Sequence, residues 1–285
     1  MENALTLAQW SRASGLPPLE ARALLSHVLQ VTPAWIIAHD EVTLDEMSRR
    51  CLDALADRRR QGEPVAYLLG EKEFWGTMFK VTPDVLIPRP DTEALVETAL
   101  RYIPVKQETR ILDLGTGSGA IAIAIARERP QARLWAADVS AAALRVAEEN
   151  ATNLLQQDAA RIVWCLSDWF AAIPAPRQDS ERFSVIVSNP PYIAAADTHL
   201  NEGDIRFEPR GALVGGISGG EALQAIAQQA SSYLQPGGVL LMEHGYDQGD
   251  VVMALLRDAG FTQCETVRDL AGVPRVTLGR WRTDY

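Results

Sequence analysis

The stretch RILDLGTGSGAIAIAIA, residues 110–126, decides the fold. It begins with residues 110–114 (RILDL), which predict a buried strand, and continues through a turn that holds three glycines. An apolar segment from Ala120 onward then predicts a helix. Glycines let a backbone turn tightly and approach a ligand closely, next to a helix N-terminus. The order strand, glycine turn, helix predicts the nucleoside-binding half of an open α/β sheet.

A second strand, residues 134–138, ends in Asp138, at the spacing of a carboxylate that binds a ribose hydroxyl pair. Dinucleotide enzymes carry G-x-G-x-x-G, whereas here the glycines follow one another at every second position, with Asp113 two residues before the first. This pattern is typical of S-adenosylmethionine enzymes and favours that methyl donor over NAD. The predicted cofactor-binding residues of the turn are Gly115, Thr116, Gly117, Ser118 and Gly119.

A third strand, residues 161–166, ends at Asp168 and Trp169. An acid and an aromatic ring at the carboxyl end of a strand, beside the nucleoside site, are suited to bonding the adenine amino group and covering the adenine ring. The alternative interpretation is a capped turn with a tryptophan in the core.

The fourth strand, residues 183–187, leads into Ser188-Asn189-Pro190-Pro191-Tyr192. Each proline fixes its own φ and restricts the preceding residue, so the loop is stiff. It presents the Asn189 amide, the Pro190 carbonyl and the Tyr192 ring to a planar amide or amidine, which has N–H groups to donate and a flat face to cover. The alternative is a proline-rich turn that merely ends a strand.

The remainder of this half continues the alternation of helices and strands. We expect a helix over 220–234, a turn at 235–238, a fifth strand over 239–243, a helix near 250–259 and a closing hairpin of 263–267 with 273–281. Such alternation requires a parallel sheet covered on both faces, with its ligands at the carboxyl ends of the strands.

The N-terminal third predicts helices that share a small core, from residue 4 to about 70. Thr43 with Glu46 three residues later has the form of a capping box at the start of one helix. The apolar positions that we expect on the two main helices are Leu19, Ala23, Leu24 and Val28, then Leu44, Met47, Cys51, Leu52 and Leu55.

Residues 71–88 predict a β-hairpin connector with its turn at Thr82-Pro83-Asp84. Arg89 follows between two prolines, and Asp91 is placed to cap the next helix. A lone arginine is usually a surface or pairing residue, but a guanidinium held this rigidly also suits a substrate contact or a brace for the catalytic loop.

Composition narrows the class of protein. The chain has 285 residues, of which 47% are hydrophobic, and a net charge of −10. No apolar run is long enough for a bilayer span and residues 1–5 show no secretory signal, so we expect a cytoplasmic protein without a membrane partner. Three scattered cysteines and four scattered histidines predict neither disulfides nor a metal site.

The acidic balance also disfavours an extended nucleic-acid footprint, which depends on clustered Lys and Arg. The densest basic run is Arg58-Arg59-Arg60, at the end of a predicted helix. We interpret it as a solvated face that complements the helix C-terminus. The alternative is contact with an acidic partner or ribosomal RNA.

Together, the motifs at 113–119, 138, 168–169 and 189–192 resemble class I methyltransferases that act on planar nitrogen, which include N6-adenine and glutamine N5 enzymes. The helical N-terminal third, the hairpin, the segment 87–93 (IPRPDTE) and the segment 206–213 (RFEPRGAL) make the chain similar, nearly end to end, to the bacterial glutamine methyltransferases of peptide chain release factors. One departure from that pattern is Ala194-Ala195-Ala196, where more polar residues are expected.

The resemblance implies an α/β fold, Rossmann-like, with a seven-stranded mostly parallel sheet and a small N-terminal helical domain. It implies a helical substrate-recognition domain at 1–72, a β-hairpin linker at 73–89 and a methyltransferase domain at 90–285 that uses S-adenosylmethionine and releases S-adenosylhomocysteine. The implied substrate is the glutamine of the Gly-Gly-Gln motif in class I release factors, which the N-terminal helices would grip, and the implied role is in translation termination.

The resemblance also implies roles for individual residues. Asn189 and the Pro190 carbonyl would accept the two N–H groups of the substrate amide, and Tyr192 would pack on its plane. The implied catalytic residues are Asn189, Pro190 and Tyr192; the cofactor-binding residues are 115–119, Asp138, Asp168, Trp169 and Asn189; the substrate-binding residues are Arg89, Asn189, Pro190, Pro191 and Tyr192. The competing hypotheses are a nucleic-acid adenine methyltransferase and a non-catalytic module that binds the methyl donor.

Overall fold

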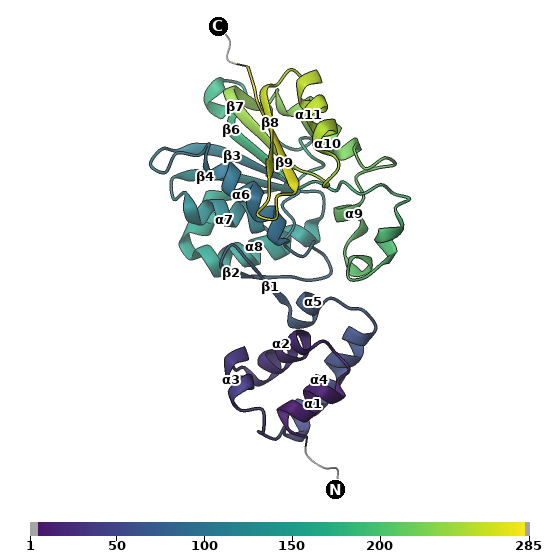
Figure 1. Cartoon of the computed structure of the whole chain (residues 1–285). Helices are drawn as coiled ribbons and strands as arrows, with labels where there is room; N and C mark the ends of the chain where they lie inside the picture. Colours follow the sequence, from purple (N-terminus) through teal and green to yellow (C-terminus); the bar gives the residue numbers. More distant parts are fainter. Residues whose placement is uncertain (1–4, 283–285) are drawn as a thin grey trace. The chain divides into compact units, whose positions relative to one another are not determined.

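The computed structural model describes residues 5–282. The first four and last three residues of the predicted domains therefore lie outside the described range. So do residues 1–4 of the five that we expect to carry no secretory signal. The chain divides into two compact units, which Figure 1 draws. The helical unit comprises Met1–Glu71 with Glu202–Phe207, and the sheet unit comprises Lys72–Asn201 with Glu208–Tyr285. The three-part division expected from the sequence places the hairpin apart from both units and stays a prediction.

Five helices form the helical unit around a small apolar core. They are α1 (Leu7–Ala13), α2 (Pro18–Leu29), α3 (Pro33–Ala38), α4 (Glu46–Arg60) and α5 (Val65–Leu69). The core includes Trp10, Leu24 and Leu52, all fully buried, and the Trp10 indole donates to Asp53 Oδ1 at 2.8 Å. These short helices are stabilised by the core that they share.

The start of α4 differs from the expected capping box at Thr43. The N-cap is Asp45, whose carboxylate accepts a hydrogen bond from the Ser48 backbone N–H at 2.9 Å. Thr43 is still extended, because it pairs with Thr6 in an antiparallel bridge. Of the apolar positions expected on this helix, Leu52 is buried, whereas Met47 is 82% exposed.

The arginine run at the end of α4 makes more ion pairs than the predicted solvated face would. Arg59 lies between two carboxylates of the same unit, Glu20 at 2.7 Å and Asp204 at 2.8 Å. The hydrogen bonds that the guanidinium donates to these carboxylates raise its pKa above the ordinary value. Arg206 adds a hydrogen bond to the Gln61 carbonyl at 2.6 Å, so the segment Glu202–Phe207 is fastened to α2 and α4.

The sheet unit contains one seven-stranded sheet with the order β5-β4-β3-β6-β7-β9-β8. The five strands from β5 to β7 run parallel, and β9 runs antiparallel to both β7 and β8. This confirms the predicted α/β fold with a mostly parallel sheet. The strands are β3 (Thr109–Leu114), β4 (Ala132–Asp138), β5 (Ile162–Leu166), β6 (Phe183–Ser188), β7 (Leu234–Glu243), β8 (Thr262–Arg268) and β9 (Pro274–Arg280).

Helices cover both faces of this sheet, as Figure 1 shows. One hydrophobic cluster packs alternate strand residues against α6 and α7, and a second packs the other set against α10 and α11. The helices of the unit are α6 (Glu93–Leu100), α7 (Ala120–Glu128), α8 (Ala141–Leu155), α9 (Arg210–Leu213), α10 (Glu221–Ala230) and α11 (Gly249–Asp258). The short 3-10 helices are η1 (Pro90–Thr92), η2 (Gln156–Arg161), η3 (Asp179–Glu181) and η4 (Thr198–Asn201) in this unit, and η5 (Ile205–Phe207) in the helical unit.

The hairpin turns earlier than expected, between β1 (Glu71–Phe74) and β2 (Thr77–Lys80). Its two turn residues are Trp75 and Gly76, with φ of 51° and 66°. Positive φ at both positions characterises the tight turn that suits the right-handed twist of a hairpin. The predicted turn at Thr82–Asp84 is a separate bend, closed by a hydrogen bond from the Val85 N–H to the Thr82 carbonyl at 3.1 Å.

Strand β7 also differs from expectation. Its predicted first residue was 239, after a turn at 235–238, whereas the strand already begins at Leu234 and absorbs that turn as an irregularity. Phe183 pairs with Leu234, and Val185 next pairs with Val239, so the glycine-containing segment between them is extra length in one strand. Such an insertion bends a strand without ending it.

Asn150 on α8 joins the hairpin to the sheet unit. Its side chain accepts from the Lys80 N–H at 2.7 Å and donates to the Lys80 carbonyl at 3.0 Å and the Ser118 carbonyl at 2.9 Å. Because the residue is buried, water cannot replace these hydrogen bonds. One side chain therefore holds both the end of β2 and the glycine turn.

Replacing Asn150 with Ala should lower the free energy of unfolding by about 2–3 kcal/mol, because it leaves buried backbone groups without partners. Urea denaturation followed by circular dichroism measures the loss. The matched control is Asn153→Ala, an exposed position on the same helix, which should change stability by no more than about 0.5 kcal/mol. Equal effects of the two substitutions would contradict the role given to Asn150.

Candidate active site

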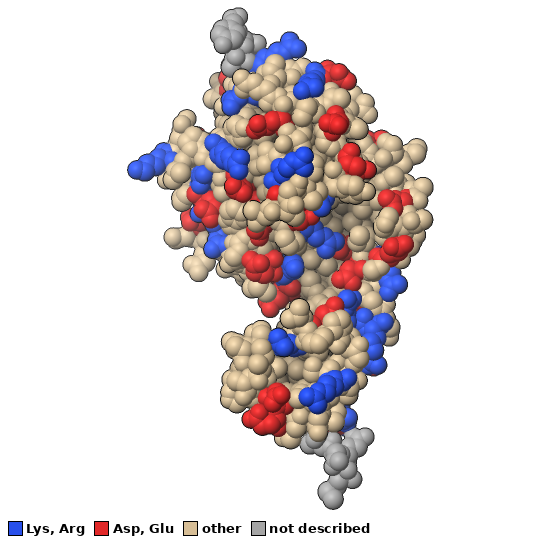
Figure 2. Space-filling view, viewed as in Figure 1, with Lys and Arg blue, Asp and Glu red and all other residues tan. Residues whose placement is uncertain are grey.

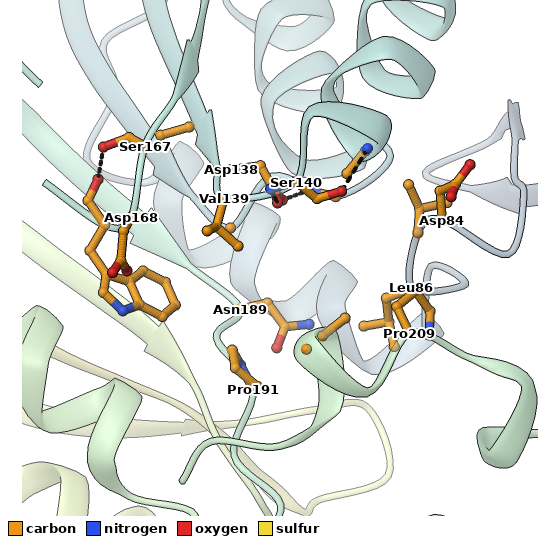
Figure 3. Close-up of a pocket in the computed structure, with 18 residues that line it drawn as sticks. Asp84, Leu86, Asp138, Val139, Ser140, Ser167, Asp168, Asn189, Pro191 and Pro209 are labelled. Atoms are coloured by element: carbon orange, nitrogen blue, oxygen red, sulfur yellow. Dashed lines mark hydrogen bonds between the residues drawn. The ribbon is translucent and has the colours of Figure 1, made fainter. Parts of the chain in front are cut away.

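A pocket lies at the carboxyl ends of the parallel strands (Figure 3). Its wall includes Gly115 and Gly117 after β3, Asp138 at the end of β4, Asp168 after β5 and Asn189 after β6. Figure 3 shows the side chains of Asp138, Asp168 and Asn189 on different sides of one cavity.

The glycine turn needs its glycines. Gly115, Gly117 and Gly119 all have positive φ, at 73°, 56° and 81°. A Cβ on Gly119 would lie 3.0 Å from an Ile123 side-chain atom and 3.1 Å from the Ala147 Cβ. A residue other than glycine would therefore have a strained backbone at these three positions, and at Gly119 its side chain would also be crowded.

The five residues predicted to bind cofactor in this turn do not all face the pocket. Gly115 and Gly117 line it, whereas the Thr116 and Ser118 side chains are buried in the protein. The Thr116 hydroxyl donates to Asp113 Oδ2 at 2.7 Å, and the Ser118 carbonyl accepts from Asn150. Gly119 is buried as well and does not line the pocket, so two of the five predicted residues reach its wall.

Asp138 is held by backbone N–H groups on both carboxylate oxygens. Oδ2 accepts from Gly117 and Oδ1 accepts from Ser140, each at 2.9 Å. Burial raises the pKa of Asp138, and the backbone hydrogen bonds oppose that shift. Each carboxylate oxygen can accept more than one hydrogen bond, so a hydroxyl pair in the pocket can still be bound.

Asp168 and Trp169 follow β5 in a capped turn, and both also line the pocket. The Ser167 hydroxyl donates to the Trp169 carbonyl at 2.8 Å and accepts from the Ala172 N–H at 2.9 Å. Trp169 has a φ of 46°, which turns its ring toward Gly115. The capped turn weighed as an alternative is therefore real, and it directs the acid and the ring into the cavity.

The loop after β6 is held through its backbone. The Ile193 N–H donates to the Leu213 carbonyl and the Gly215 N–H donates to the Ile193 carbonyl, both at 3.0 Å. Two glycines allow this close approach: a Cβ on Gly215 would lie 2.3 Å from the Pro191 oxygen, and one on Gly219 would lie 2.5 Å from the Tyr192 oxygen. The stiffness expected from the prolines is thus reinforced by a second segment.

The loop residues differ in what they face. Asn189 and Pro191 line the pocket, and the Asn189 Nδ2 donates to the Thr92 hydroxyl at 3.2 Å. Pro190 is buried and the Tyr192 ring packs against the second hydrophobic cluster, so neither belongs to the pocket wall. Burial raises the pKa of Tyr192 to about 12, which keeps the phenol neutral. Their predicted contacts with substrate stay predictions.

Arg89 has the contacts of a brace. Its guanidinium pairs with Glu208, whose side chain is fully buried and also accepts from the Ile87 N–H at 3.4 Å. The next residue, Pro209, lines the pocket. The pair therefore fastens the segment before η1 to the segment that closes the cavity, while the predicted substrate contact of Arg89 stays a prediction.

Asp91 does not cap the helix that follows it. It pairs with Arg275 of β9 at 2.8 Å, and α6 has no side-chain hydrogen bond at its N-cap, Thr92. The 3-10 turn η1 precedes α6 directly, so the position expected for a cap is already helical. Two residues beside Asn189 were not predicted from the sequence: Thr92, and the buried Glu243 at the end of β7. Glu243 could have been found, because it is an acidic residue at the carboxyl end of a predicted strand.

Two family models match this chain. The model described as the PrmC N-terminal domain matches residues 6–70, and the one described as the methyltransferase small domain matches residues 91–205. The release factor glutamine methyltransferase of Bordetella pertussis is 52% identical, over 93% of this chain and 95% of its own. The chain belongs to the release factor glutamine methyltransferase family. The enzyme of the same name from Burkholderia pseudomallei is 50% identical, over 96% of each chain.

A crystal structure of a methyltransferase from Pyrococcus furiosus has a TM-score of 0.52 and 17% identity, covering 80% of this chain and 98% of that one. At this identity it shows the fold alone. The predicted family and class I methyltransferase fold are confirmed, and membership of this family makes the chain an enzyme that uses S-adenosylmethionine. Within residues 5–282 no group of three or more His, Cys, Asp or Glu is placed to hold a metal ion. No helix in that range is long and apolar enough to cross a membrane.

The pKa of Asp113 generates a prediction about stability and pH. Asp113 is fully buried before the glycine turn, its Oδ1 has no hydrogen-bond partner, and burial raises its pKa to about 7. The folded protein therefore keeps a proton that an unfolded aspartic acid releases near pH ~4. Stability contributed by this proton is present at low pH and is lost as the pH rises through the folded pKa.

Asp113→Asn has no such proton to lose. Relative to the wild type, its free energy of unfolding should increase between about pH 4.5 and about pH 7.5 and then level off. Urea denaturation of both proteins at a series of pH values measures the difference. Two curves that stay parallel across this range would show that Asp113 does not titrate as its burial implies.

Proposed function

We propose that this protein transfers the methyl group of S-adenosylmethionine to the side-chain nitrogen N5 of the glutamine in the Gly-Gly-Gln motif of class I peptide chain release factors. The observation that carries the proposal is the position of Asn189 and Pro191 at a pocket whose other walls carry Asp138 and Asp168. The names of the curated relatives support the choice of substrate. The reaction would support translation termination in the cytoplasm and leave S-adenosylhomocysteine.

The residues of the pocket fit the cofactor. The Asp138 carboxylate suits the ribose hydroxyl pair, the Asp168 carboxylate suits the adenine amino group, and the Trp169 ring suits the adenine face. Gly115 and Gly117 let the backbone approach a ligand without a Cβ between them. Bound there, S-adenosylmethionine supplies a methyl group activated by a sulfonium, so the transfer needs no metal.

The protein's task is to orient the substrate amide, because an amide nitrogen is a poor nucleophile. The Asn189 nitrogen donates to Thr92, which leaves the oxygen of the same amide to accept a substrate N–H. The Pro190 carbonyl would accept the other N–H, and Tyr192 would cover the amide plane. Positioning of this kind contributes up to roughly 7–11 kcal/mol in favourable cases, without a strong general base.

A protein substrate agrees better with the charge than a nucleic acid does. The chain has a net charge of −10, and on the face of the sheet unit in Figure 2 acidic side chains are interspersed with basic ones. Binding to a phosphate backbone depends on clustered Lys and Arg. We accordingly expect no direct contact with nucleic acid or membrane, and we assign the grip on the release factor to the helical unit.

The reaction can be tested directly by incubating a folded class I release factor with this protein and S-adenosylmethionine, followed by intact-mass and peptide mass spectrometry. We expect one added methyl group on the glutamine of the Gly-Gly-Gln loop, and none on a factor in which that glutamine is replaced. Transfer to an adenine-containing oligonucleotide with no change in the factor would move the assignment to nucleic acids.

Replacing Asn189 with Ala should lower kcat by at least about 100-fold, the size of effect seen when one preorganised polar group at a reacting centre is removed. Calorimetric titration with S-adenosylhomocysteine should show affinity weakened at most moderately, since the other walls of the pocket are intact. Asn153→Ala, an exposed position on α8, is the matched control and should keep full activity. An active Asn189→Ala enzyme would refute this mechanism.

A further inference from the structure

Glu243 ends β7 directly beside the catalytic loop. Its neighbour Met242 pairs with Ser188, the residue before Asn189, so the two strand ends lie side by side. The residue is 1% exposed, and its Oε2 has no hydrogen-bond partner. The side chains of Thr92 and Asn189 are neighbours of the carboxylate and lower its pKa against the effect of burial.

Thr92 links these two groups. It is buried at the end of η1, and its hydroxyl oxygen accepts from the Asn189 Nδ2 at 3.2 Å. Three side chains from parts of the chain far apart in the sequence therefore form one polar set: Thr92 and Asn189 share a hydrogen bond, and Glu243 is a neighbour of both. Asn189 is the member of the set that lines the pocket.

The direction of the hydrogen bonds in this set matters. An asparagine amide can be turned over with little change in shape, which exchanges its acceptor oxygen and its donor nitrogen. A threonine hydroxyl can either donate or accept, so alone it tolerates both orientations. An ionised carboxylate accepts only. Next to Glu243, the Thr92 hydroxyl must donate to the acid, and its lone pairs are left for the Asn189 nitrogen.

We propose that Glu243 is a positioning residue that fixes, through Thr92, the orientation of the Asn189 amide, so that the Asn189 oxygen faces the substrate. The inference rests on the proposed function, in which that oxygen accepts a substrate N–H. Glu243 does not contact the substrate or the cofactor in this scheme. It determines which end of the Asn189 amide the substrate meets.

Packing alone does not account for a glutamate at this position. A buried carboxylate is costly unless it is paired. The nearby cation, Arg275, makes its ion pairs with Asp91 and Asp269 and acts on Glu243 at longer range. A residue that served only to fill space would be apolar, as its neighbour Met242 is.

Glu243 should also make the reaction depend on pH. Burial raises its pKa to about 7, and a protonated carboxyl can donate to Thr92 and release the constraint. The other charged or titratable groups around it are Arg275 of β9, Asp91 of η1, His244 next to it and Tyr192 after β6. Burial lowers the pKa of His244 and raises that of Tyr192 to about 12, so both are neutral near pH 7.

The test compares Glu243→Gln, Thr92→Val and Thr92→Ser with the wild type in release factor methylation. Glu243→Gln keeps the shape but adds a donor, and Thr92→Val keeps the shape but removes the hydroxyl. Both should lower kcat by about 100-fold, the cost of a misplaced reacting group. The affinity for S-adenosylhomocysteine should stay within about threefold, because the change is confined to positioning. Thr92→Ser retains the hydroxyl and should recover most of the activity.

Three further measurements separate positioning from damage to the fold. Thr98→Val is the matched control. Thr98 lies about one and a half turns into α6 and is buried, and its hydroxyl donates to the Ala94 carbonyl of the same helix. It should keep wild-type activity. The double variant Glu243→Gln/Thr92→Val should be no slower than the slower single variant, because both break one chain of hydrogen bonds. The fall in kcat below about pH 7 should be absent from Glu243→Gln.

If Glu243→Gln does not fold, the contrast between Thr92→Val and Thr92→Ser decides the matter. Two results would overturn the inference and leave the proposed function standing, provided that the wild type methylates the release factor. One is an unchanged kcat in both Glu243→Gln and Thr92→Val. The other is a double variant whose loss in kcat is the product of the two single losses. A wild-type protein that does not methylate the release factor glutamine would overturn the proposed function and the inference with it.

Discussion

The parallel pairing of β6 between β3 and β7 is the constraint on which the site depends. Ser188 at the end of β6 pairs with Leu114 on one side and with Met242 on the other, and its hydroxyl donates to the Leu114 carbonyl at 2.7 Å. This register brings the glycine turn, the Asn189 loop and Glu243 to one edge of the sheet. A slip of one residue would turn each strand's side chains to the opposite face and separate these groups.

Much of the fold follows from local patterns in the sequence. The apolar strands were predicted to within a few residues at most ends, because buried parallel strands are continuous apolar runs. Two of the errors occurred where a distant segment decides the local structure. Thr43 fails as a cap because it pairs with Thr6, and Asp91 fails because Arg275 binds it. Neither partner is near in the sequence, so no window of residues around these positions contains the deciding interaction.

The same distinction divides the site. Gly115, Gly117 and Asp138 could be predicted because their geometry is set by the turn and strand that contain them. Thr92 could not, since its partner Asn189 is 97 residues away. Tyr192 shows a further limit: its ring packs on the second hydrophobic cluster, which adjacency to Asn189 in the sequence did not reveal, and its contact with substrate stays a prediction. Patterns locate a loop well, but the direction of each side chain depends on tertiary packing.

Two buried carboxyl groups flank the site, and both have an oxygen without a hydrogen-bond partner: Asp113 below the glycine turn and Glu243 beside Asn189. Desolvation opposes the ionised form of each, so both lower the stability of the fold near neutral pH. Each also has a threonine hydroxyl of a pocket loop as a neighbour: Asp113 accepts from Thr116 at 2.7 Å, and Thr92 lies next to Glu243. An ionised carboxylate can only accept, so while the acid is ionised the loop beside it has one hydrogen-bonding arrangement instead of two. The proposed mechanism depends on holding a weak nucleophile in one orientation. For such a site, a single hydrogen-bonding arrangement matters more to the reaction rate than the stability that the buried acids cost, because a misoriented amide does not react.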